Sequence, residues 1–287
     1  MSTSLRSVEY KHVEVTLEDH ILTLCLNSPD TLNALSLEMM DEIVGVLDTA
    51  HHDPEVRVLI ITGAGRAFCA GGNVKAMGEI SDDNARAHPL ERPLWNVPSM
   101  SVADRLKLRR QTGREVMVSI SKLDKPTIAA VNGLAAGAGC DLSLVCDVRF
   151  IAESARFSEI YVRRGLVPAD GGMYWMPKIV GLGRALEILY SGDWVDSKEA
   201  YRIGLANRVL PDAELMDATR QFALRLADGP PLALHAIKSG VRQLNVPDFE
   251  ESLGLSYEMC EYLLQTEDHK ESVAAFTEKR PPVFSGR

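Results

Sequence analysis

The 287-residue sequence lacks the features that mark membrane and secreted proteins. It has no run of 18 apolar residues, so no transmembrane helix is expected. Its first 15 residues have no apolar core of the kind that signal peptides carry. The five cysteines are odd in number, scattered and without a C-x-x-C pair, which favours neither disulfides nor zinc and predicts a reducing, cytoplasmic setting.

The sequence also lacks the short motifs of several large enzyme classes. It contains no P-loop, GxGxxG, GxSxG or HExxH pattern, which removes the usual support for nucleotide-binding proteins, serine hydrolases and zinc proteases. The net charge of −9 argues against nucleic acid and against an anionic membrane surface as partners. No metal site is expected. With 46% apolar and 25% charged residues, the composition is typical of a globular protein.

The first half of the chain alternates between apolar, β-branched runs and helical patterns. We expect strands at Ile21–Leu26, Val56–Thr62, Thr127–Val131 and Val148–Ala152. Ser36 is predicted to cap a helix, because apolar residues recur after it at helical spacing. Strands that are separated by helix-length segments predict a layered α/β core.

From Gly171 onward the pattern predicts helices. Asp196 is expected to cap one helix and Asp212 to open another, and one long helical pattern covers Phe249–Phe276. The proline-containing stretch Ser81–Ser101 is predicted to be irregular. It is either a loop that shapes a ligand pocket or a variable surface loop.

Two glycine-rich segments, 63–75 and 132–141, each follow a predicted strand directly. In each, the chain turns on glycines and starts a helix, where backbone N–H groups are unpaired and point outward. Two such starts side by side would form a two-donor oxyanion hole, whereas tight packing of the turns is the alternative. Asp141, at the end of the second segment, is either a general acid or base beside the hole or a first-turn acid on the helix dipole.

Five segments resemble the crotonase, or enoyl-CoA hydratase/isomerase, superfamily: PDTLNALS (29–36), GRAFCAGGNVKAM (65–77), KPTIAAVNGLAAGAGCDLSLVCD (125–147), the stretch 157–183 and AFTEKRPPVF (275–284). They occur in the usual order and spacing, from about residue 10 to the end. The resemblance implies an α/β fold, a spiral of β-β-α turns with a helical C-terminal region. Residues 1–205 would form the core with the coenzyme A and oxyanion-hole loops, and residues 206–287 a trimerisation region of a homotrimer or dimer of trimers.

The resemblance implies a coenzyme A thioester as ligand, with no separate cofactor. The backbone N–H groups of Gly72 and Ala138 would hold its carbonyl oxygen and stabilise an enolate-like intermediate. Further residues fall where the family contacts coenzyme A and the acyl group: Thr31, Leu32, Ala34, Arg66, Ala70, Gly71, Asn73, Val74, Lys75, Leu134, Gly137, Ile160, Pro168 and Lys279. Lys279 falls where some members reach the coenzyme A phosphate of a neighbouring subunit. Arg66 and Lys75 are alternatively solvated surface charges.

The sequence departs from the family pattern at the two glutamates that hydratases use. Asp141 occupies the first position and Tyr161 the second, and a phenol with a pKa near 10 is a poor base at neutral pH. Asp170 lies in a segment where other branches carry an active-site aspartate, often one position earlier. It is predicted either to act in catalysis or to cap the following helix. Glu159 is a weaker acid/base candidate, two residues before Tyr161.

These patterns predict an enzyme that acts on an acyl-CoA thioester through an enolate, by 2-enoyl-CoA hydration or double-bond isomerisation. The alternatives are thioester hydrolysis, carbon–carbon bond cleavage, and coenzyme A binding with little catalysis. RNA binding is disfavoured by the net charge. The sequence predicts no acyl-chain specificity, and Tyr174 and Trp175 are expected either to line the acyl pocket or to lie in the core.

Overall fold

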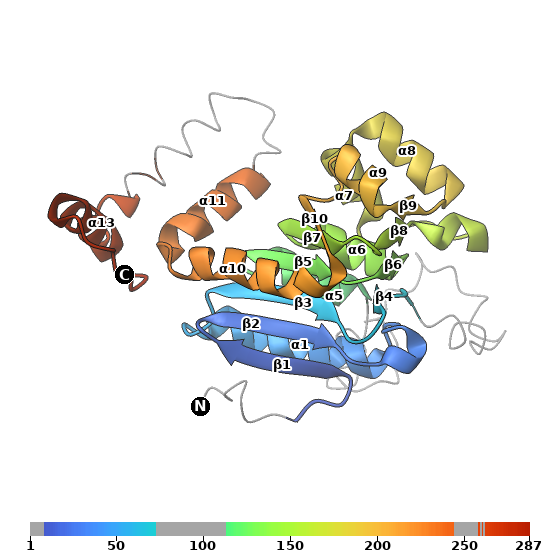
Figure 1. The fold of residues 1–287 in the computed structure, drawn as a ribbon, viewed down its shortest axis with the longest axis horizontal. Helices are drawn as coiled ribbons and strands as arrows, with labels where there is room; N and C mark the ends of the chain where they lie inside the picture. Colours follow the sequence, from blue (N-terminus) through green and yellow to red (C-terminus); the bar gives the residue numbers. More distant parts are fainter. Residues whose placement is uncertain (1–8, 73–112, 244–257, 259, 261) are drawn as a thin grey trace, which may run out of the picture.

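The fold is taken from a computed structural model, which describes residues 9–72, 113–243, 258, 260 and 262–287 (Figure 1). The candidate residues Asn73, Val74 and Lys75 lie outside the described residues, as does the Ser81–Ser101 stretch. In the part of the chain that is described, no helix has the length and apolar character needed to cross a membrane.

A six-stranded sheet forms the centre of the molecule, in the order β1-β2-β3-β5-β7-β10. Its strands are β1 (Val13–Glu18), β2 (Ile21–Leu26), β3 (Val58–Gly63), β5 (Thr127–Val131), β7 (Val148–Ala152) and β10 (Arg208–Leu210). The β1–β2 hairpin is antiparallel and the other pairs are parallel. The four predicted strands are confirmed, although β3 begins two residues late because the Val56 N–H closes a turn onto the carbonyl oxygen of Asp53.

A second, four-stranded sheet runs beside the first in the order β4-β6-β8-β9. It contains β4 (Ala67–Cys69), β6 (Leu134–Ala136), β8 (Arg156–Ser158) and β9 (Val195–Asp196). Successive turns of the chain place one strand in each sheet, as β3 with β4, β5 with β6 and β7 with β8. A helix then follows, such as α6 (Ala138–Val145) after β6. The spiral of β-β-α turns is thus confirmed.

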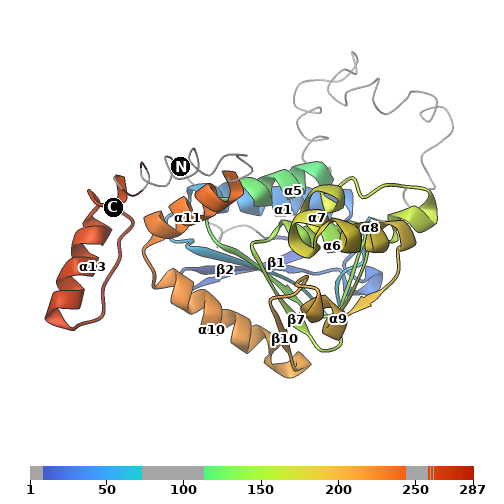
Figure 2. The ribbon, with the colours of Figure 1, turned by 90° about the horizontal axis from the view of Figure 1, so that it is seen from above.

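Helices cover both faces of the large sheet (Figure 2). The helices α1 (Leu37–His52) and α5 (Gly113–Lys122) lie on one face and α10 (Leu215–Ala227) lies on the other. Every residue of β3 and β5 is buried, as expected for parallel strands between two helical layers. The predicted cap of α1 is confirmed, because Ser36 Oγ accepts a hydrogen bond from the Met39 N–H at 3.1 Å.

The chain from Gly171 onward is mostly helical, as predicted. Its longer helices are α7 (Gly172–Val180), α8 (Leu182–Ser191), α9 (Ser197–Arg202), α10, α11 (Pro231–Gln243) and α13 (Glu267–Glu278). Asp196 caps α9 by accepting from the Glu199 N–H at 2.8 Å, also as predicted. Asp212 opens a short 3-10 turn, Asp212–Glu214, that leads into α10.

The prediction of one continuous helix through Phe249–Phe276 is wrong in its described part. The chain turns at residues 264–266, and α13 starts afresh after Thr266. The Thr266 hydroxyl accepts from the His269 N–H at 3.1 Å and donates to the carbonyl oxygen of Leu263 at 2.7 Å. A threonine that bonds to the backbone in this way favours a helix start over a helix interior.

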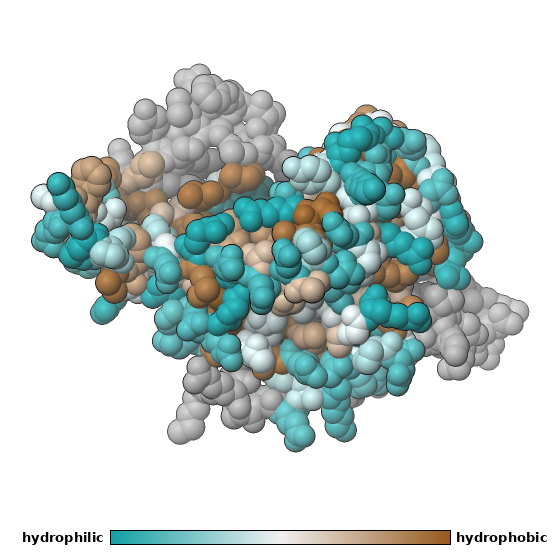
Figure 3. All heavy atoms as spheres, viewed as in Figure 1, coloured by the Kyte–Doolittle hydropathy of each residue, from teal (hydrophilic) through white to brown (hydrophobic). Residues whose placement is uncertain are grey.

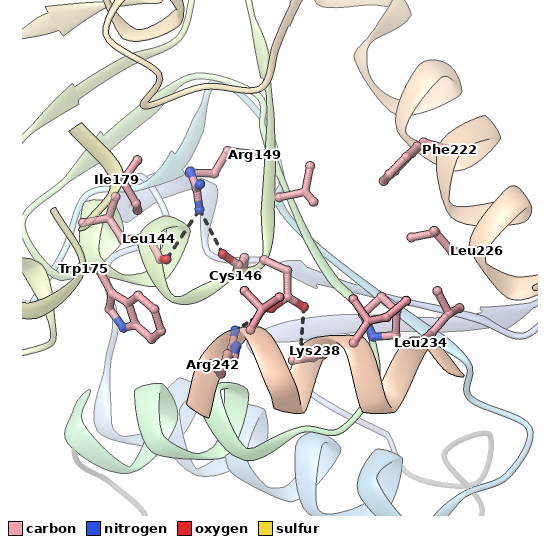
Figure 4. Close-up of a pocket in the computed structure, with 15 residues that line it drawn as sticks. Leu144, Cys146, Arg149, Trp175, Ile179, Phe222, Leu226, Leu234, Lys238 and Arg242 are labelled. Carbon is pink, nitrogen blue, oxygen red and sulfur yellow. Dashed lines mark hydrogen bonds and ion pairs between the residues drawn. The ribbon is translucent and has the colours of Figure 1, made fainter. Parts of the chain in front are cut away.

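Two elements after residue 205 belong to the central layers. β10 pairs with β7, and α10 packs on the large sheet. Asp147 fastens α11 to the core through Lys238 at 2.8 Å and Arg242 at 2.6 Å (Figure 4). An apolar hollow of about 360 Å³ lies beside these pairs, between α7, α10 and α11, and shows as brown surface in Figure 3. The division of the chain at residue 205 stays a prediction.

Candidate active site

The two glycine-rich segments meet at one edge of the small sheet, because β4 and β6 run parallel and both segments continue from them. Gly71 has a φ of +93°, and a Cβ there would lie 2.6 Å from the Ala136 carbonyl oxygen and 3.3 Å from the Ala138 nitrogen. Only glycine permits this approach. Among the described residues, neither the Gly72 N–H nor the Ala138 N–H donates to a protein acceptor. Two amide donors are therefore available where the segments meet.

The loop before α1 runs alongside the first glycine segment. The Ala70 N–H donates to the Leu32 carbonyl oxygen at 2.9 Å, and the Leu35 N–H donates to the Gly71 carbonyl oxygen at 2.8 Å. The predicted coenzyme A residues Thr31, Leu32 and Ala34 are thus placed next to Ala70 and Gly71. Thr31 and Arg66 are exposed, as a contact with a solvated phosphate chain requires.

Two asparagines that are not among the predicted site residues hold these loops together. Asn33 is fully buried, and its Nδ2 donates to the carbonyl oxygens of Ala64 at 2.9 Å and Ala67 at 2.8 Å. The side-chain Nδ2 of Asn132 donates to the Gly65 carbonyl oxygen at 2.9 Å. The position of each asparagine beside a glycine-rich turn is the sequence signal that could have predicted this role. A side-chain amide there can donate to loop carbonyl oxygens that have no backbone partner.

A phenol lies between two carboxyl groups at the start of α6. The Tyr161 hydroxyl is 2.8 Å from Asp141 Oδ2 and 3.1 Å from Asp170 Oδ2. Asp141 comes from the first turn of α6, Tyr161 from the 3-10 turn η3 (Ile160–Arg164) and Asp170 from the loop before α7. The Tyr161 ring lies 3.6 Å from the point where a Cβ of Gly137 would be. The structure thus brings the three predicted side chains together beside Ala138.

The structure tests one of the two roles predicted for Asp170, the capping of α7. Gly171, with a φ of +127°, is the N-cap of α7, and no side chain caps this helix. The capping role is therefore wrong. Asp170 lies one position later than the active-site aspartate of other branches. Its carboxyl group nevertheless contacts Tyr161, because the chain bends at Gly171. Gly113 leaves room for it, since a Cβ at that position would lie 2.5 Å from Asp170 Oδ1.

Burial dominates the electrostatics of this cluster. Asp141 is 0% exposed, and burial, followed by the negative charge of Asp170, raises the pKa of Asp141 to about 7, although the hydrogen bond from Tyr161 lowers it. Burial also raises the pKa of Asp170, against the hydrogen bond from Tyr161. The pKa of Tyr161 is raised by burial and by both carboxylates, so Tyr161 remains a neutral phenol. Asp141 can therefore exchange a proton near neutral pH.

Glu159 lies against Asp141 and is also 0% exposed. Burial and the charge of Asp141 raise the pKa of Glu159 to about 9. The strand-like spacing of Glu159 to Tyr161 makes it only a weaker acid/base candidate in the sequence. The burial of Glu159 against α6 is set by tertiary packing, which that spacing does not report.

Some of the remaining predicted residues lie at the cluster of Asp141, Tyr161 and Asp170, and one lies far from it. Ile160 and Pro168 lie at the cluster, 3.7 Å from the Cβ position of Gly137 and 2.9 Å from that of Gly172. Lys279 ends α13 at the far side of the molecule, so one chain does not bring it to the cluster (Figures 1 and 2). Asp170 opens onto a hollow of about 390 Å³ that Tyr174 and Trp175 also line, so both aromatic residues line a cavity.

Comparisons with known proteins agree with this fold. The profile of the family described as enoyl-CoA hydratase/isomerase matches residues 16–98 and 99–287. A crotonyl-CoA hydratase from Syntrophomonas wolfei is 32% identical over 276 residues, which are 96% of this chain and 98% of that relative. A 1,2-epoxyphenylacetyl-CoA isomerase from Escherichia coli is 32% identical, covering 94% of this chain and 97% of that relative. A solved enoyl-CoA hydratase from Bacillus anthracis superposes with a TM-score of 0.85 at 29% identity, covering 96% of this chain and 100% of that one.

The two-sheet spiral and the paired glycine loops define a crotonase-type protein. The chain belongs to the enoyl-CoA hydratase/isomerase family and is an enoyl-CoA hydratase/isomerase-like enzyme.

Proposed function

We propose that this enzyme converts the double bond of an acyl-CoA thioester through an enolate, either by adding water to a 2-enoyl-CoA or by moving the double bond. The observation that carries the proposal is the Tyr161 hydroxyl between Asp141 at 2.8 Å and Asp170 at 3.1 Å. Both reactions need a proton at one carbon of the acyl chain to be gained or lost, and this cluster holds exchangeable protons.

The thioester carbonyl oxygen is bound by the N–H groups of Gly72 and Ala138. The support is that both amides lie where the glycine segments meet and have no acceptor among the described residues. As negative charge develops on the carbonyl oxygen, the two amides stabilise it without reorganising. In an enzyme of this kind one such donor is worth about 3 kcal/mol of barrier.

Asp141 is the acid/base of the reaction and acts through Tyr161. Asp141 is buried whereas Tyr161 is partly exposed, so a substrate proton reaches Asp141 across the phenol oxygen. The hydroxyl passes its own proton to Asp141 Oδ2 as it accepts one from the substrate. The pKa of Asp141 near 7 suits both directions of this transfer.

Tyr161 replaces the second glutamate of the family's hydratases, and Asp170 supplies the second carboxyl group in its place. Asp170 is partly exposed beside the hollow that Tyr174 and Trp175 line. A carboxyl group there can hold a water molecule against the acyl chain. The replacement is therefore compatible with hydration as well as with isomerisation. Thioester hydrolysis is the second candidate, since the same water could attack the carbonyl carbon.

Coenzyme A is part of the substrate, and no separate cofactor takes part. The support for this ligand comes from two relatives, which are named for crotonyl-CoA and 1,2-epoxyphenylacetyl-CoA. Its pantetheine and phosphates lie along Thr31, Leu32, Ala34 and Arg66. Lys279, distant from the cluster in its own chain, serves a neighbouring subunit of a trimer or dimer of trimers. A cytoplasmic location stays a prediction from the cysteine content.

The test is turnover of crotonyl-CoA, a longer 2-enoyl-CoA and a 3-enoyl-CoA by the full chain. Hydration removes the absorbance of the conjugated thioester, isomerisation of the 3-enoyl substrate creates it, and hydrolysis releases free coenzyme A that a thiol reagent detects. Asp141→Asn is the inactive control. If no thioester changes in any of the three assays, the proposal is wrong.

A further inference from the structure

Glu159 is a buried carboxyl group that no cation in the described part of the chain neutralises. Neither oxygen of Glu159 accepts a hydrogen bond of ordinary geometry from a described residue, and neither does Asp141 Oδ1. Of these residues, only the weak Cys140 thiol acts on Glu159 as a donor, and the Gly172 N–H acts on Asp141. No ion pair joins either residue to a lysine, arginine or histidine in the described part of the chain. A buried carboxylate without a strong donor or a cation is strongly unfavourable, so at least one of the two groups must carry a proton.

The backbone at Gly172 brings these oxygens together. A Cβ on Gly172 would lie 2.6 Å from Asp141 Oδ1 and 2.9 Å from Glu159 Oε1. Asp141 Oδ1 and Glu159 Oε1 therefore line one small space, which stays open because Gly172 has no side chain. Two carboxyl oxygens attract each other in such a space only when one of them carries a proton.

The described titratable groups around Glu159 include no cation that could stabilise its charged form. They are Cys140 and Asp141 on α6, Tyr161 on η3 and Asp170 before α7, and all are neutral or acidic. Arg149, the cation that acts on Cys140, donates to the carbonyl oxygens of Leu205 and Cys146. Burial and the charge of Asp141 raise the pKa of Glu159 to about 9, above the value of about 7 for Asp141. Asp141 also accepts from the Tyr161 hydroxyl, which stabilises its charged form, whereas Glu159 has no such donor among the described residues; the proton therefore stays on Glu159 when Asp141 ionises.

We propose that Glu159 is a positioning residue whose protonated carboxyl group donates to Asp141 Oδ1 and keeps Asp141 ionisable at neutral pH. Tyr161 donates to the opposite oxygen, Asp141 Oδ2. Each oxygen of Asp141 then has its own donor, which fixes the plane of the carboxylate toward Tyr161. Glu159 is buried and does not reach the substrate. This inference rests on the proposed role of Asp141 in thioester turnover.

The test compares the pH dependence of kcat for Glu159→Gln and Glu159→Met with that of the wild type. In the wild type, kcat rises with pH as Asp141 ionises. Glutamine keeps a donor at position 159, so the midpoint of this rise should stay at the wild-type pH. Methionine has no donor, so this rise moves upward by about one to two pH units and kcat recovers at higher pH. Above about pH 9 the wild type loses activity as Glu159 ionises, and neither variant does.

The exposed Glu153, in the turn after β7, provides the matched control, and Glu153→Gln leaves the profile unchanged. A purely structural role for Glu159 would lower kcat equally at all pH values. If the profile of Glu159→Met rises at the wild-type pH, or if glutamine and methionine give the same profile, the inference is wrong.

A second measurement separates this inference from the proposed function. If the wild type converts no thioester, the proposed function fails, but NMR titration of the Asp141 carboxyl carbon still reports its pKa. The inference then predicts the same Asp141 titration in the wild type and Glu159→Gln and a higher one in Glu159→Met. Equal titration in all three proteins overturns it.

Discussion

Replacing Tyr161 by phenylalanine removes one hydroxyl group and leaves the aromatic ring in place. In the structure this hydroxyl contacts both Asp141 Oδ2 and Asp170 Oδ2, at 2.8 and 3.1 Å. The variant loses the group that carries the proton between substrate and Asp141. General acid–base catalysis contributes about 10²- to 10⁴-fold to rates, so kcat on the preferred thioester should fall by about that factor.

The same substitution also changes the acidity of Asp141. A hydrogen bond to a charged group is worth about 1.5–3 kcal/mol, and one pKa unit corresponds to about 1.4 kcal/mol. Since the bond from Tyr161 lowers the pKa of Asp141, its loss should raise that pKa by about one to two units from about 7. The residual activity should therefore rise with pH later than that of the wild type.

The assay is the pH dependence of kcat, with Tyr190→Phe as the control because Tyr190 is 72% exposed on α8. Thermal melting should show a folded variant, destabilised by about 1–3 kcal/mol because the buried Asp141 carboxyl group loses its donor. If Tyr161→Phe keeps wild-type kcat and an unmoved pH profile, the phenol takes no part in proton transfer.

Three further substitutions test other parts of the site. Asp170→Asn should lower kcat at least about tenfold while the melting temperature stays near the wild-type value, and unchanged kinetics would remove Asp170 from the mechanism. Gly172→Ala should lower both kcat and stability, because its Cβ would lie 2.6 Å from Asp141 Oδ1, and wild-type behaviour would show that the backbone moves freely there. Asn33→Ala should lower stability by about 1–3 kcal/mol and raise KM for acyl-CoA more than it lowers kcat, whereas an unchanged KM would separate this loop from coenzyme A binding.

The pH dependence of stability gives a test that needs no substrate. Glu159 has a raised pKa in the folded chain, so the unfolded chain releases its proton at lower pH than the folded one. The free energy of unfolding should therefore fall as pH rises from about 4.5 toward about 9. Glu159→Gln removes this contribution. The melting temperature of the variant, relative to that of the wild type, should therefore increase as pH rises through this range. Parallel melting curves over these pH values would contradict the raised pKa.

Much of the fold could be predicted from the sequence where the local pattern is strong. The strands β2, β5 and β7 are mostly apolar, and burial between two helical layers favours that composition. The strands β4 and β8 have three residues each, too few to show a period of two. The break at Thr266 was missed because the apolar spacing on its two sides resembles that of one helix.

The candidate site could be predicted in part, for a related reason. Asp141 follows from its place at the end of the second glycine-rich segment, and Tyr161 follows from the resemblance to the family's hydratases. The direction of Asp170 depends on the positive φ of Gly171 and on the space beside Gly113, which is distant in sequence. The burial of Glu159 likewise depends on packing against α6. Such contacts between distant segments leave no local pattern.

Deuterium transfer from solvent to the α-carbon of an acyl-CoA tests the central claim most directly, because an enolate forms or collapses by transfer of a proton at this carbon. NMR in D₂O should show rapid α-carbon exchange with the wild type on at least one of the crotonyl, longer 2-enoyl or 3-enoyl thioesters. Asp141→Asn should bind coenzyme A as tightly and exchange at least about a hundredfold more slowly. Exchange at the wild-type rate in Asp141→Asn would contradict the account.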